Sequence, residues 1–129
     1  MIKNKLKELI SKGEFIKAKS IISNITKDEL ETILFEIACD EESICAYSFI
    51  CFLMMEDENV EYHCMASSLL NTAFPHFAGG YETSLHHIRR AIELDPNNKE
   101  LKRTLLFFND IPEKLVSDKE ASIILDEIQ

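Results

Sequence analysis

The side chains most able to bind a metal or attack a substrate are four histidines and four cysteines in a chain of 129 residues. His63 is followed by Cys64, and His86 by His87. Neighbouring residues on a helix point about 100° apart, so neither pair can hold one metal ion as residues i and i+4 do. The spacing therefore predicts no metal site. We expect His86 to be exposed and His87 to be partly buried, with a hydrogen-bonded ring.

The spacing of the four cysteines favours a role in packing over one in metal binding. No Cys-x-x-Cys pair occurs among Cys39, Cys45, Cys51 and Cys64. In a reducing compartment such residues are most simply buried apolar thiols. The chain also lacks the nucleophile-elbow, phosphate-loop and His-Glu-x-x-His motifs. We therefore expect no catalytic residue and no cofactor. An enzyme whose site is assembled from distant residues is an alternative.

Charge is unevenly distributed along the chain. Residues 1–27 carry a net charge of +5, whereas residues 28–62 hold eleven acids and no Lys or Arg, and the whole chain has a net charge of −9. Nucleic-acid binding needs clustered cations, so the negative electrostatic field of this chain opposes binding to nucleic acid. An acidic surface can instead steer a basic protein partner, and we predict Glu41, Glu42, Asp57 and Glu58 as its contacts. The alternative is that these acids only solvate helix ends.

Composition favours a single helical domain over residues 1–129. The chain is 46% hydrophobic. It has only three glycines and three prolines, so few residues break the helices, and long helices are expected. Residues 44–55 form the longest apolar run, which is shorter than the ~20 residues of a membrane span. Residues 1–7 lack the apolar stretch of a signal peptide. We expect a soluble cytoplasmic protein that makes no membrane contact.

The clearest helix lies within residues 79–98. Its apolar positions recur every three or four residues and so form one buried stripe: Tyr81, Ser84, Leu85, Ile88, Ala91 and Ile92. Paired glycines precede this helix and Pro96 ends it. Asn97 is then expected to cap the following helix, with Glu100 as its reciprocal partner.

A pattern in this helix is repeated earlier in the chain. Gly79-x-Tyr81-x-x-Ser84 follows Gly13-x-Phe15-x-x-Ala18 after 66 residues, and all three glycines lie in these two turns. Each glycine should therefore mark a positive φ or a close approach between helices. Residues 79–98 resemble the second helix and closing turn of a tetratricopeptide repeat, and residues 13–25 resemble it more weakly. The offset of 66 residues is close to the length of two such repeats.

The remaining patterns predict about seven to eight helices in an antiparallel hairpin stack. Thr26-x-x-Glu29 and Ser117-x-x-Glu120 are capping boxes that begin helices. The apolar run 44–55 should form the centre of the bundle. Residues 99–108 form a seventh helix, and residues 113–129 form a terminal segment that caps the stack.

The resemblance also implies a concave groove, lined by the first helix of each hairpin, that holds peptides. Projected onto this chain, the groove residues are Glu31, Phe35, Ala73, His76, Asn98, Arg103 and Phe107. The segment Phe74-Pro75-His76-Phe77 has two interpretations, a kinked part of the core or an exposed aromatic contact.

These observations predict a non-catalytic protein that binds another protein. The favoured case is an immunity protein or antitoxin that neutralises a basic toxin through the acidic surface. The alternative is a chaperone or adapter that holds a peptide in the groove.

Overall fold

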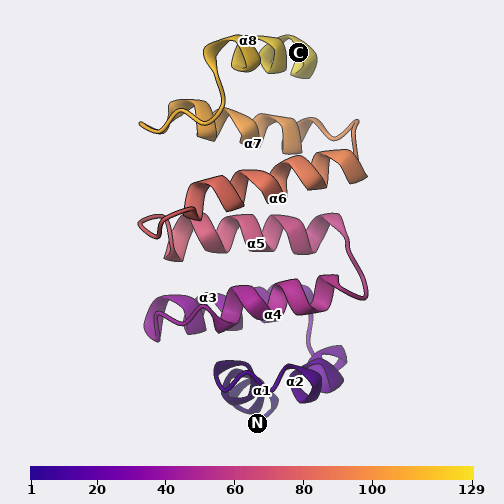
Figure 1. Cartoon of the computed structure of the whole chain (residues 1–129). Coiled ribbons are helices and arrows are strands. Elements are labelled where there is room, and N and C mark those ends of the chain that lie inside the picture. The colour runs from indigo at the N-terminus through magenta and orange to yellow at the C-terminus, as the bar shows by residue number, and fades with distance from the viewer.

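A computed structural model describes residues 1–129 and contains eight α-helices, one short 3-10 helix and no strand (Figure 1). The elements are α1 (Ile2–Ser11), α2 (Phe15–Ile21), η1 (Ile22–Asn24), α3 (Lys27–Asp40), α4 (Cys45–Met54), α5 (Val60–Ala73), α6 (Gly80–Leu94), α7 (Lys99–Asp110) and α8 (Asp118–Ile128). The prediction of an all-α fold is confirmed. None of these helices combines the length and apolar character that crossing a bilayer requires.

The helices from α3 onward are stacked, with each one running opposite to its predecessor (Figure 1). In this view α3 lies behind α4, α5 to α7 follow as successive rungs, and α8 closes the far end, while α1 and α2 lie across the other end. This arrangement is compatible with the hairpin stack that the resemblance implies. It places the α3–α4 and α5–α6 turns at one side of the stack and the α4–α5 turn at the other (Figure 1).

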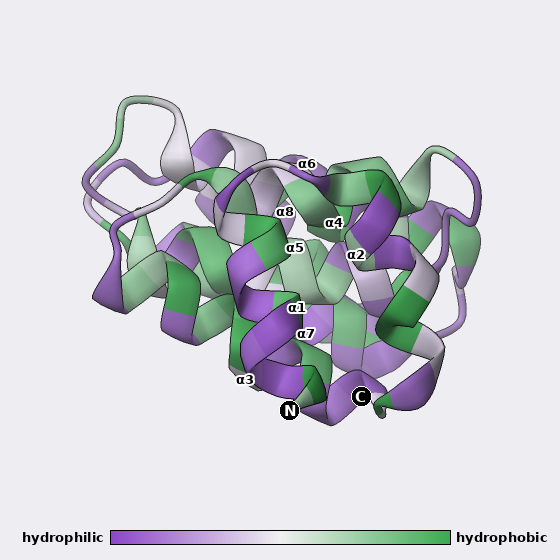
Figure 2. Ribbon diagram, turned by 90° about the horizontal axis from the view of Figure 1, so that it is seen from below, coloured by the Kyte–Doolittle hydropathy of each residue, from purple (hydrophilic) through white to green (hydrophobic).

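The hydrophobic core is divided into two clusters. The first contains nineteen buried residues, from α1 to α5 together with Phe74, and α4 packs against α1, α2, α3 and α5 within it. The predicted central position of residues 44–55 therefore fits, although Ile44 and Met55 at its ends are exposed. The second cluster contains seven residues from α6, α7, α8 and the segment between the last two helices. Figure 2 shows apolar residues along α4 and α5, behind the more hydrophilic α1.

The α5–α6 interface between the clusters contains small and polar side chains. Ser84 Oγ donates to the Ser67 carbonyl oxygen at 3.0 Å and lies 2.7 Å from Ser67 Oγ. Because the Ser84 proton is used in this bond, the Ser67 hydroxyl donates to Ser84 Oγ. Both side chains are buried, so this pairing satisfies groups that would otherwise weaken the interface.

The three glycines fill the roles predicted for them. Gly13 and Gly79 have φ of 76° and 83°, which only glycine adopts readily. A Cβ atom on Gly80 would lie 2.3 Å from the carbonyl oxygen of Phe74, so this residue permits the close approach. Ala18 and Ser84, which share a position in the two repeated patterns, are both fully buried.

The helix caps agree with the sequence only in part. Thr26 and Glu29 form the predicted capping box. Asn98 caps α7 by accepting from the Leu101 amide, so the prediction of Asn97 was wrong by one residue.

The predicted box that begins α8 is only half formed. Ser117 accepts from the Glu120 amide. The Glu120 carboxylate binds Arg89 with two hydrogen bonds of 2.8 and 3.0 Å. Glu120 therefore links α8 to α6.

Candidate functional site

Lysines of the N-terminal segment neutralise part of the acidic segment 28–62. The ion pairs are Lys3–Glu29 at 3.1 Å, Lys7–Glu36 at 3.7 Å, Lys27–Glu61 at 3.0 Å and Lys19–Glu56. These contacts join the two oppositely charged parts of the chain. The acidic surface is therefore smaller than the sequence alone indicates.

Glu58, one of the four predicted contact acids, is also paired within the protein. Arg90 donates to it through Nε at 2.7 Å and through Nη2 at 2.9 Å, and His63 Nε2 lies 2.7 Å from its Oε2. The hydrogen bonds from Arg90, and then from His63, lower the pKa of Glu58 to about 2. Its carboxylate is thus engaged at the α4–α5 turn.

The four predicted acids do not form one patch. Glu41 and Glu42 lie before α4, whereas Asp57 and Glu58 lie after it. This helix has ten residues, which corresponds to a length of about 15 Å. The two pairs are therefore on opposite sides of the stack (Figure 1).

The acids at the end of α3 have no cationic partner. Six of the eleven acids in residues 28–62 make no ion pair, and three of these are consecutive. We call Asp40, Glu41 and Glu42 the acidic edge. The last turn of α3 contains no basic residue, and the helix dipole is itself negative at this end. The acidic edge is therefore a site of uncompensated negative charge.

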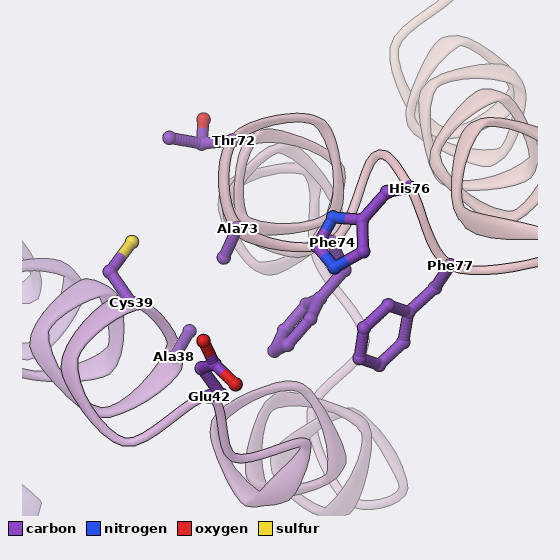
Figure 3. Close-up of a pocket in the computed structure, with 8 residues that line it drawn as sticks. All are labelled: Ala38, Cys39, Glu42, Thr72, Ala73, Phe74, His76 and Phe77. Carbon is purple, nitrogen blue, oxygen red and sulfur yellow. The ribbon is translucent and has the colours of Figure 1, made fainter.

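A cavity of about 240 Å³ adjoins the acidic edge (Figure 3). Ala38, Cys39 and Glu42 line it on one side, and residues 72–74 with His76 and Phe77 line it on the other. Figure 3 shows the Glu42 carboxylate beside Ala38, across the cavity from the Phe74 and Phe77 rings, while the Cys39 thiol and the His76 ring lie well apart. The cavity brings Glu42 together with Ala73 and His76, which the sequence placed in two different predicted surfaces.

Glu42 has an unusual backbone conformation. Its φ is 52°, and it directly follows Glu41, the C-cap of α3. Glycine normally fills this position because a Cβ atom makes the left-handed conformation costly. A charged side chain is therefore held beside the cavity at some cost in stability.

Both interpretations of residues 74–77 apply, each to different side chains. Phe74 is buried at 1% exposure, whereas Phe77 is 43% exposed and His76 is exposed. The centroid of the Phe77 ring lies 4.9 Å from that of Phe74 and 4.9 Å from that of His76. Phe74 therefore anchors an exposed aromatic pair to the core.

The structure does not gather the predicted groove residues into one site. Asn98 caps α7, and Arg103 pairs with Glu100. Phe107 packs against Tyr81, with 5.8 Å between ring centroids. The other residues are also separated: Phe35 packs on the first core cluster, and Glu31 lines a separate cavity beside Cys64. Only Ala73 and His76 share the cavity of Figure 3.

Sequence reasoning missed a chain of hydrogen bonds through the interior. His63 Nδ1 lies 2.9 Å from His87 Nδ1, and His87 Nε2 lies 2.8 Å from the Tyr47 hydroxyl. Both imidazole rings are 4% exposed, which confirms the prediction for His87. His86 is exposed, as predicted. The two buried histidines are 24 residues apart, so the adjacent pairs in the sequence gave no sign of this contact.

The direction of each hydrogen bond in this chain follows from its ends. The Glu58 carboxylate can only accept, so His63 donates from Nε2 and, in its neutral form, accepts at Nδ1. His87 must then donate from Nδ1 and accept the Tyr47 proton at Nε2. Burial, followed by the nearby rings of His63 and His86, lowers the pKa of His87 to about 4. His87 is therefore neutral at pH 7, and each nitrogen of the two rings has a hydrogen-bond partner.

The cysteines differ from the prediction. Cys39 is exposed, and Cys45, Cys51 and Cys64 are only half-buried, with all four free. Burial raises the pKa of the Cys64 thiol. The expectation of four buried thiols was wrong because these residues lie at the borders of the packed helix faces. The structure contains no group of three or more His, Cys, Asp or Glu side chains suited to a metal ion.

Comparison of the chain with known protein families, curated proteins and solved structures finds no match. The resemblance to tetratricopeptide repeats therefore stays a prediction, and function has to be argued from the acidic edge and its cavity.

Proposed function

We propose that this protein is a non-catalytic module that binds a basic protein through the acidic edge. An immunity protein or antitoxin of the cytoplasm, which covers a cationic toxin, is the class that fits best. The observation that carries this proposal is the absence of any ion pair at Asp40, Glu41 and Glu42. Five other acids of the same segment are paired within the protein.

The location of the acidic edge supports a role in association. Three carboxylates at the negative end of a helix repel one another and the helix dipole. A cationic partner would relieve this repulsion, and the long-range field would raise its association rate. Glu58 does not belong to this surface, because Arg90 and His63 already bind it.

The two alternatives have less support. A chaperone or adapter would need its groove residues free to hold a peptide, but Asn98 caps α7, Arg103 pairs with Glu100 and Phe107 packs against Tyr81. An enzyme would need reactive groups in contact, and the Cys39 thiol and the His76 ring lie apart in the cavity (Figure 3).

Binding kinetics of two matched variants test the proposal. The protein is used to capture its partner from native lysate, and the partner is then identified and purified. One variant neutralises the acidic edge with Asp40→Asn, Glu41→Gln and Glu42→Gln. The control neutralises three acids that also make no ion pair, Asp110, Glu113 and Asp126.

We expect a basic partner whose association rate falls about tenfold or more in the acidic-edge variant at low salt. The control should retain the rate and the salt dependence of the unmodified protein. Equal rates for the two variants, or an acidic partner, would overturn the proposal.

A further inference from the structure

We infer that the cavity beside Glu42 receives one arginine side chain of the basic partner. This inference rests on the proposed function and makes it specific, because it names the group that the partner inserts. The cavity, its aromatic wall and its single carboxylate supply three complementary contacts for a guanidinium group on an apolar stem.

The walls of the cavity suit the stem and the flat face of arginine. Ala38, Ala73 and Phe74 provide apolar surface, against which the methylene groups of a long side chain can pack. Phe77 is 43% exposed and its ring borders the cavity (Figure 3). A guanidinium group stacks favourably on such a ring through cation–π attraction.

Charge complementarity selects a cation over other groups. Glu42 is the only Asp, Glu, Lys or Arg among the lining residues. No Lys or Arg occurs between Lys27 and Arg89, and no cation of the protein pairs with Glu42. The other two acids of the acidic edge precede it directly and add to the field. An incoming cation therefore meets a carboxylate with no competing partner.

Size and geometry favour a single arginine. The volume of about 240 Å³ lies below the ~300–1,000 Å³ typical of cofactor and drug-sized ligand sites, so one side chain is a better match. Arginine can bind a carboxylate with two parallel hydrogen bonds and is less strongly hydrated than lysine. These properties lower the cost of removing its charge from water.

A second copy of this chain is a less favourable source of the occupant. The chain has three arginines, and all of them are engaged: Arg89 with Glu120, Arg90 with Glu58 and Glu93, and Arg103 with Glu100. Docking any of them into another copy would first break an ion pair. An arginine of a different protein, free of such a pair, is therefore the better occupant.

The first test uses acetyl-arginine-amide as a probe and records amide chemical shifts by NMR. We expect saturable shifts at Cys39, Glu42, His76 and Phe77, with an affinity of about millimolar order for a single side chain. Acetyl-citrulline-amide has nearly the same shape without the charge and should bind at least about tenfold more weakly. Acetyl-lysine-amide should fall between the two.

Matched variants test whether Glu42 is the residue that binds the arginine probe. Glu42→Gln should weaken the arginine probe at least about tenfold, whereas Asp110→Asn, at the end of a different helix, should leave its affinity unchanged. Equal binding of arginine and citrulline, or equal binding to Glu42→Gln and the unmodified protein, would overturn the inference.

The second test separates this inference from the proposed function. Association of the purified partner is measured with Glu42→Gln, with Phe77→Ala and with Asp40→Asn/Glu41→Gln. We expect the first two to speed dissociation about tenfold or more, and the double variant mainly to slow association. If only the double variant matters and the probe does not bind, the cavity inference is wrong and the proposed function stands. If no acidic variant changes association, the proposed function is wrong. The inference that an arginine of the partner occupies the cavity is then wrong as well.

Discussion

Acidification should destabilise the fold through His87. Its pKa is lowered from 6.5 to about 4 in the folded protein, chiefly by burial, and it is near the ordinary value in the unfolded chain. Below pH 6.5 the unfolded state binds the proton first, so the free energy of unfolding falls as the pH falls toward 4. At about 1.4 kcal/mol per pKa unit, the loss reaches about 2 kcal/mol at pH 5 and about 3 kcal/mol at pH 4.

Burial and the neighbouring rings explain why the folded state resists this proton. His63 and Tyr47 face His87 from α5 and α4, and His86 is its neighbour on α6. A proton on His87 Nε2 would reverse the direction of the bond with Tyr47, and it would place a charge at a site with 4% exposure. The cost of burying this charge therefore favours the neutral ring.

Urea unfolding at about pH 7.5 and about pH 5 measures the effect. In the variant His87→Gln the amide can still donate to His63 and accept from Tyr47, but it does not titrate. We expect the unmodified protein to lose about 2 kcal/mol more than this variant over that interval. His86→Gln removes an exposed histidine and should behave like the unmodified protein.

The choice of pH keeps Glu58 out of the measurement. The pKa of this acid is lowered to about 2 from 4.5, so the stability it contributes is present above pH 4.5 and is lost between 4.5 and 2. Nearly all of its effect thus lies below the interval tested. Equal losses in the unmodified protein and in His87→Gln would refute the reasoning.

Two further predictions concern backbone geometry. Glu42→Gly should raise the free energy of unfolding by about 1 kcal/mol, because Glu42 has a φ of 52° that glycine adopts freely, whereas Glu41→Gly, with a φ of −101°, should lower it. Gly80→Ala should cost about 1–3 kcal/mol, because the added Cβ would lie 2.3 Å from the Phe74 carbonyl oxygen. Gly13→Ala should cost about 1 kcal/mol, because its φ is 76° but the space around it is open. Urea unfolding ranks all four variants, and the opposite order within either pair would contradict the corresponding explanation.

Local signals in the sequence were enough to predict the helices. The glycine turns, the Thr26 cap and the apolar period depend on residues within a few positions of one another, and the structure retains them. The cap of α7 was misplaced because Asn97 and Asn98 are adjacent and either can accept a bond from the first turn. Helix boundaries are commonly uncertain by a residue or two for this reason.

Contacts between distant helices were not predictable in the same way. The pairing of His63 with His87 depends on the register between α5 and α6, and the engagement of Glu58 depends on where Arg90 emerges from α6. No short sequence motif indicates the register between α5 and α6 or the position of Arg90 relative to Glu58. The cavity depends on two distant segments, 38–42 and 72–77, meeting at the ends of α3 and α5, so Glu42 and His76 were assigned to separate surfaces although both line it.

The acidic edge is a run of three consecutive acids without an ion pair, in a segment where five other acids are paired. Lysines at positions 3, 7, 19 and 27 compensate acids on neighbouring helices, yet no cation reaches Asp40, Glu41 or Glu42. The third acid also has a left-handed conformation that glycine would relieve. A chain selected for stability alone could remove both costs with single substitutions. Their presence beside an aromatic cavity is what the proposed binding of a cation at this position would require.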